Sequence, residues 1–130
     1  MRGAGALEKA WLEKDTLKDV AVYVVWSPQL GAEEKHVASA TALVPDPRAR
    51  HYWDPQMLVG SAYQPLIGSR AAAWDTWAVF DKITMWGMTG VPRPAWLEHQ
   101  MSSGPKALML DPDRWASHAV ALHDVNADHR

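Results

Sequence analysis

Cysteine is absent from all 130 residues of this chain. Disulfide bonds, zinc–thiolate sites, thiol nucleophiles and Cys-x-x-Cys redox chemistry are therefore excluded together. Any chemistry that the chain supports must use other side chains, and the absence of cysteine leaves the cellular compartment open.

Excess positive charge and long apolar runs are also missing. The formal net charge is −2 and the isoelectric point is near 6.3, so no broad basic field attracts nucleic acid or anionic membranes. The longest apolar run, residues 20–26, is far too short to span a bilayer, and residues 1–7 lack the apolar region of a signal peptide. We expect a cytoplasmic protein with neither nucleic acid nor a membrane as a partner.

Several short catalytic motifs are absent as well. The sequence holds no glycine-rich phosphate loop, no Gly-x-Ser-x-Gly elbow and no EF-hand spacing. These absences argue against nucleotide-dependent chemistry and esterase-type serine catalysis, while a triad assembled from distant segments stays open.

The composition indicates one globular domain. Hydrophobic residues make up 48% of the chain and charged residues 22%, which is ordinary for a domain of this length with a real core. We assign residues 1–125 to a single domain and residues 126–130 to a polar tail. Eight tryptophans stand against one phenylalanine. They either fill the core or line an aromatic pocket or partner surface.

Hydrophobic spacing divides the chain into alternating helices and strands. Apolar residues at helical spacing and Asp-Pro pairs predict helices over residues 5–15, 32–44 and 55–66 and from 111 onward. β-Branched and aromatic runs predict strands over residues 20–26, 48–53, 73–82 and 106–110.

Residues 20–26 are apolar at both alternations, which predicts a strand buried on both faces. Residues 96–101 fit a short strand or a helical turn equally well. The alternation of elements favours an α/β fold with a largely parallel sheet covered by helices.

Four motifs resemble a group of uncharacterised bacterial thioredoxin-like proteins. They are VVWSP (24–28), DPRARHYWD (46–54), AWD (73–75) and WLEHQ (96–100). The resemblance implies a thioredoxin-like sheet with helices on both faces, in which residues 20–26, 48–53 and 74–80 are strands. It also implies that this chain lacks the N-terminal strand and the Cys-x-x-Cys motif that its relatives carry before the first helix.

The implied loss of that strand leaves its two neighbours in the sheet without a partner. Unpaired backbone groups cost free energy when they are buried. Either the two flanking strands close up directly, or a second copy of the chain supplies the pairing. We expect a homodimer.

The densest polar cluster runs from His51 to Asp54, at the expected end of a strand and start of a helix. Ligands bind at such places in open α/β sheets. His51 and Asp54 could act as general base and orienting acid, or as two metal ligands. The alternative is that Asp54 only caps the helix and His51 is structural.

A second polar pair, Glu98 and His99, lies near a proline-rich loop. If both segments reach the same end of the sheet, His51, His99 and Glu98 form an open site for a divalent metal ion. No His-Glu-x-x-His pattern is present, so the alternative is an ordinary surface pair.

Aromatic residues near the expected strand ends indicate a ligand-binding cleft. Its candidate residues are Trp26, Trp53, Trp74, Asp75 and Trp77. Buried aromatic packing is the simpler explanation of the same residues.

Three functional hypotheses follow from the sequence. The first is a redox-inactive thioredoxin-like binding domain with an aromatic cleft and no cofactor. The second is a small enzyme that uses His51, Asp54 and His99, with or without a divalent metal ion. The third is a truncated thiol oxidoreductase that has lost its Cys-x-x-Cys motif.

Overall fold

The computed structural model describes residues 2–14, 19–88 and 90–128 and has a mixed α/β fold. Its helices are α1 (Arg2–Leu7), which continues as the π-helical turn η1 (Glu8–Leu12), α2 (Val37–Thr41), α3 (Leu58–Ile67) and α4 (Pro112–Asp128). Its strands are β1 (Val22–Trp26), β2 (Ala49–Trp53), β3 (Thr76–Val79) and β4 (Trp96–His99). Three short 3₁₀ turns are η2 (Gln29–Gly31), η3 (Glu34–His36) and η4 (Lys106–Leu108).

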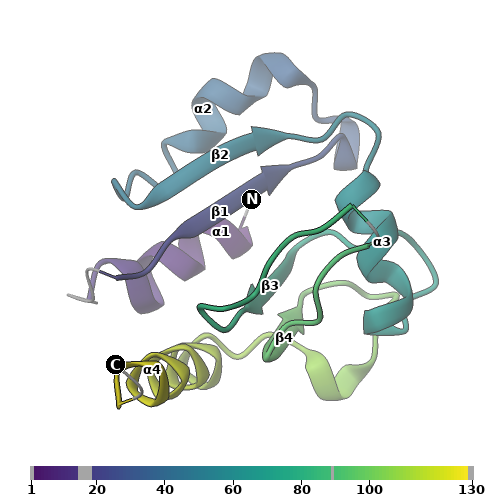
Figure 1. The fold of residues 1–130 in the computed structure, drawn as a ribbon. Helices are drawn as coiled ribbons and strands as arrows, with labels where there is room; N and C mark the ends of the chain where they lie inside the picture. The colour runs from purple at the N-terminus through teal and green to yellow at the C-terminus, as the bar shows by residue number, and fades with distance from the viewer. Residues whose placement is uncertain (1, 15–18, 89, 129–130) are drawn as a thin grey trace.

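The four strands form two sheets of two strands each. β1 and β2 are parallel, in a register that runs from Val22 opposite Ala49 to Trp26 opposite Trp53. β3 and β4 are antiparallel, because the loop that joins them returns the chain without a crossover helix. Figure 1 shows the strands in the order β2, β1, β3, β4, with α2 above and α4 below. The prediction of one largely parallel sheet is therefore wrong for the described residues.

Most of the predicted elements are confirmed. The strands expected over 20–26, 48–53 and 73–82 are β1, β2 and the shorter β3, and the undecided segment 96–101 contains the strand β4. The strand expected over 106–110 is wrong. Residues 106–108 form η4, closed by a hydrogen bond from the N–H of Met109 to the carbonyl of Lys106. Residue 15, the last of the first predicted helix, lies outside the described residues.

Helix α3 begins later than the sequence predicts. Met57 has a left-handed backbone (φ 54°), so regular helix starts at Leu58 and not at Pro55. Asp54 still serves the helix, because its Oδ2 accepts a hydrogen bond of 2.9 Å from the N–H of Val59. At the other end, Gly68 (φ 75°) adopts the left-handed conformation that closes many helices.

Tryptophans fill the main core, which lies between the helical N-terminus, β1, β3 and α4. Trp115 packs edge-on against Trp11 and Trp77, with ring centroids 5.4 Å and 5.7 Å apart. Core filling is thus the role of these three tryptophans. The buried members of this cluster are Trp11, Leu12, Val22, Val44, Trp77, Trp115 and Ala119. A second cluster contains Tyr63, Ile67, Ala73 and Met101.

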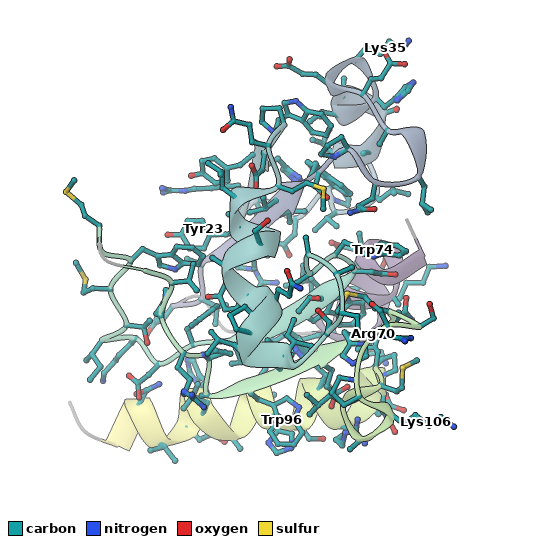
Figure 2. The ribbon with its side chains drawn as sticks, turned by 90° about the vertical axis from the view of Figure 1, so that its right-hand side faces the viewer. Tyr23, Lys35, Arg70, Trp74, Trp96 and Lys106 are labelled. Atoms are coloured by element: carbon teal, nitrogen blue, oxygen red, sulfur yellow. The ribbon has the colours of Figure 1, made fainter. Side chains whose placement is uncertain are left out.

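The expectation that β1 is buried on both faces is wrong. Val22 is buried, but Tyr23 is 61% exposed and Val25 40% exposed. Figure 2 shows Tyr23 on the side of β1 that faces away from α1. One face of the β1–β2 sheet therefore remains open to solvent. No helix in the described part of the chain is long and apolar enough to cross a membrane.

Candidate functional site

An open groove lies where the carboxyl ends of β1 and β2 meet the start of α3. Its volume is about 460 Å³, and its lining consists of Val25, Tyr52, Trp53, Asp54, Pro55, Gln56, Leu58 and Val59. The Asp54 carboxylate is already held by the N–H of Val59. The remaining lining is uncharged and mostly apolar, which suits an apolar or aromatic group more than an ion.

The groove continues onto an exposed patch that we call the aromatic face, formed by Tyr23, Val25 and Tyr52. Successive residues of a strand point to opposite sides of the sheet, so these three side chains share one face. The rings of Tyr23 and Tyr52 stack with centroids 6.3 Å apart and an interplanar angle of 28°. Tyr52 is 49% exposed. The stacked pair holds two large rings in place at the surface without burying them.

His51 and Asp54 do not form a dyad. The Nδ1 atom of His51 accepts a hydrogen bond of 3.2 Å from Nε1 of Trp26, and Nε2 lies 3.2 Å from the carbonyl of Val44. These contacts fit the tautomer that carries its proton on Nε2. Asp54 contacts the start of α3 instead. The structure thus gives each residue a local structural partner.

His99 lies in the other sheet and is fully buried. Its Nδ1 accepts a hydrogen bond of 3.1 Å from the N–H of Met101, and its Nε2 lies 3.1 Å from the carbonyl of Pro105. The ring also packs so closely against Gly104 that a β-carbon there would overlap it. His99 therefore organises the loop that follows β4.

Glu98 is fully buried beside His99 and holds three groups together. Its Oε1 accepts hydrogen bonds from Nε of Arg114 (2.6 Å) and Nε1 of Trp96 (2.9 Å), and its Oε2 accepts one from the N–H of Asp111 (2.7 Å). Figure 2 shows Trp96 against α4. Burial alone would raise the pKa of Glu98, but these hydrogen bonds lower it overall. The carboxylate anchors the start of α4 to β4.

The five residues proposed for a ligand-binding cleft are distributed over different parts of the structure. Trp53 lines the groove, whereas Trp26 stacks on His51 with parallel rings. Trp77 belongs to the main core and Trp74 packs against the second cluster. Asp75 has a left-handed backbone (φ 47°), and burial raises the pKa of its carboxyl group.

No group of three or more His, Asp or Glu side chains that could hold a metal ion occurs within residues 2–14, 19–88 and 90–128. His51, His99 and Glu98 each have the separate hydrogen-bond partners described above. Searches against family models, curated proteins and solved structures find no match to this chain. The site must therefore be interpreted from its own geometry.

The sequence pattern missed the residues that shape the exposed site. Tyr23, Val25, Tyr52 and Leu58 were not among the candidates, yet all four are exposed. The signal that points to three of them is strand alternation, because Tyr23 and Val25 alternate with Val22 and Val24 along β1, and Tyr52 pairs in register with Val25. When all residues of a strand are apolar, the sequence does not indicate which face of the strand is buried.

Proposed function

We propose that this chain is a redox-inactive thioredoxin-like domain that binds polypeptides, a second copy of itself included, through its aromatic face. The observation that carries the proposal is the stacked, half-exposed pair of Tyr23 and Tyr52 beside an uncharged groove. Exposed aromatic side chains held in fixed positions are enriched at protein interfaces, because they supply large contact area at low conformational cost.

The absence of cysteine supports the redox-inactive part of the proposal. Two further observations support the thioredoxin-like part. One is the order of helices and strands from α1 to α4, which is compatible with the resemblance in the sequence. The other is that the strands separate into a parallel pair and an antiparallel pair. Such a division is expected of a sheet from which one inner strand is missing.

In the purified protein, the polypeptide available to cover the aromatic face is a second copy. A twofold axis through the face would place Tyr23 and Tyr52 of one copy against the same residues of the other, as in most homodimers. We expect light scattering to report a mass above 14.5 kDa at high protein concentration, and a fall toward 14.5 kDa on dilution.

The test compares the wild type with the Tyr23→Ser, Tyr52→Ser double variant. The matched control is Val120→Ser, which removes an apolar side chain that is 39% exposed on α4. The double variant should stay monomeric at concentrations where the wild type and the control associate. A wild type that is monomeric throughout, or a double variant that associates as strongly as the wild type, would contradict the role of the aromatic face.

A further inference from the structure

The two sheets have free edges that lie toward each other, and we call them the inner edges. β2 covers one side of β1 and β4 covers one side of β3, and Figure 1 shows β1 and β3 as the two middle strands. No hydrogen bond between the backbones of β1 and β3 occurs in the described residues. The flanking strands have not closed up into one sheet.

The hydrogen-bond pattern identifies the groups on each inner edge. The N–H of Val22 donates to Arg48 and the carbonyl of Trp26 accepts from Asp54, so the even-numbered residues of β1 face β2. Tyr23 and Val25 therefore direct their N–H and C=O groups to the opposite side.

The backbone groups of β3 alternate in the same way. The carbonyl of Asp75 accepts from the N–H of Gln100, and that of Val79 accepts from Ala95, so the odd-numbered residues face β4. Thr76 and Ala78 consequently direct their backbone groups away from β4. Among the described residues, none of the backbone groups of Tyr23, Val25, Thr76 and Ala78 has a hydrogen-bond partner.

The side chains around the inner edges are apolar and incompletely covered. Val24 of β1 and Val79 of β3 pack against the main core but remain partly exposed, as do Ala6 and Leu7 at the end of α1. When a sheet has no missing strand, the side chains that point from it toward the core are normally buried completely. Neither the strand residues at the inner edges nor these four side chains carry a formal charge.

We infer that the inner edges of β1 and β3 bind an extended, uncharged, apolar segment of a partner polypeptide as an added strand between them. Such a strand would satisfy donors and acceptors on both sides at once and would cover the half-exposed core residues. The described segment of this chain with the same character, Val22–Trp26, is already paired with β2. We therefore take a segment of a separate polypeptide as the occupant. This inference uses strand edges and does not rest on the aromatic face.

The test uses a fluorescent peptide of alternating valine and threonine with one lysine at each end. Its central five residues match the length of β1. Fluorescence anisotropy should show saturable binding to the wild-type protein. In two further peptides, alternate residues carry N-methyl groups. One of these peptides lacks the N–H groups on one edge of the strand, and the other lacks those on the opposite edge. Each should bind about tenfold more weakly or worse, because each loses main-chain hydrogen bonds to one inner edge.

Ala78 provides the matched protein variants. Ala78→Pro removes an N–H of the inner edge without touching the pairing to β4, whereas Ala78→Gly keeps the N–H and shortens the same side chain. Circular dichroism checks that both variants fold. Ala78→Pro should weaken peptide binding by about tenfold relative to Ala78→Gly.

Three results would overturn the inference. One is no binding of the unmodified peptide to the wild type. Another is full binding by either N-methylated peptide, since a strand on an outer edge uses one side only. The last is a concentration-dependent dimer that Ala78→Pro abolishes and Ala78→Gly preserves, which would make a second copy the occupant. Fluorescence anisotropy measures peptide binding at the inner edges. Light scattering of the Tyr23→Ser, Tyr52→Ser variant measures self-association by the aromatic face. Each proposal can therefore fail without the other.

Discussion

At the scale of single residues, the polar side chains that the sequence offers for chemistry have structural roles. Glu98 and His99 are buried and His51 is partly buried, and each has a hydrogen-bond partner in another segment of the chain. Buried polar groups need such partners, because an unpaired one costs about 1 to 3 kcal/mol. Residue type and position at the end of a strand therefore do not distinguish a catalytic histidine from a structural one.

Glu98→Gln should lower the free energy of unfolding at pH 7 by about 1 to 2 kcal/mol, a modest value because the Arg114 side chain stays 41% exposed. The pKa of Glu98 is lowered in the folded protein. Its stabilising effect is therefore complete at neutral pH and is lost as the pH falls below the ordinary glutamate pKa of about 4.3.

Urea unfolding of both proteins between neutral and acidic pH provides the measurement. The difference between wild type and Glu98→Gln should shrink in acid, because a protonated Glu98 resembles glutamine. Glu34→Gln, at an exposed position of η3, is the control and should have little effect at any pH. A difference that does not change with pH would show that the charge of Glu98 is not what stabilises the start of α4.

At the scale of elements, a close contact between the backbone of α3 and the segment before β3 fixes the position of α3. The N–H of Ala73 donates a 2.8 Å hydrogen bond to the carbonyl of Gly60. A β-carbon at Gly60 would overlap the carbonyl oxygen of Ala73. Glycine is therefore required inside this helix, although it is normally less favourable there than alanine.

The substitution Gly60→Ala should destabilise the protein by about 1 to 3 kcal/mol, because the segment before β3 must move to make room. Gly5 in α1 is the matched control, since nothing lies within 4 Å of a β-carbon built there. Gly5→Ala should stabilise by about 0.5 to 1 kcal/mol through helix propensity. Thermal melts of the two variants thus shift in opposite directions, and a stabilising Gly60→Ala would refute the close contact.

At the scale of the whole molecule, one shared core joins two incomplete sheets. Trp115 of α4 contacts Trp11 from the N-terminal helical segment and Trp77 of β3, while Val22 of β1 belongs to the same cluster. Since no backbone pairing links β1 to β3 in the described residues, side-chain packing is what holds the halves together.

Trp115→Ala should lower the free energy of unfolding by about 3 to 5 kcal/mol, the range for a buried tryptophan. Amide hydrogen exchange of Val24 in β1 and Trp77 in β3 measures how far each sheet is destabilised. We expect protection to fall by a similar factor in both sheets. Loss of protection in one sheet alone would mean that the two sheets unfold independently.

The presence of most helices and strands could be predicted from the sequence, but not their exact ends or the arrangement of the sheets. The strands near residues 22, 49 and 76 were found because β-branched and aromatic residues prefer extended backbone. Division into two sheets depends on pairing between distant segments, on which local preference has no influence. For the same reason, the aromatic face was missed although both of its tyrosines stood inside predicted strands.

The sequence by itself determined the absence of thiol chemistry and the mixed α/β character, because these follow from composition and local periodicity. Only the tertiary structure decided that His51, His99 and Glu98 have structural partners and that Tyr23 and Tyr52 are exposed. It also decided that, within the described part of the chain, β1 and β3 keep free inner edges. Exposure and pairing depend on which distant segments meet, and that is settled by the packing of the whole chain.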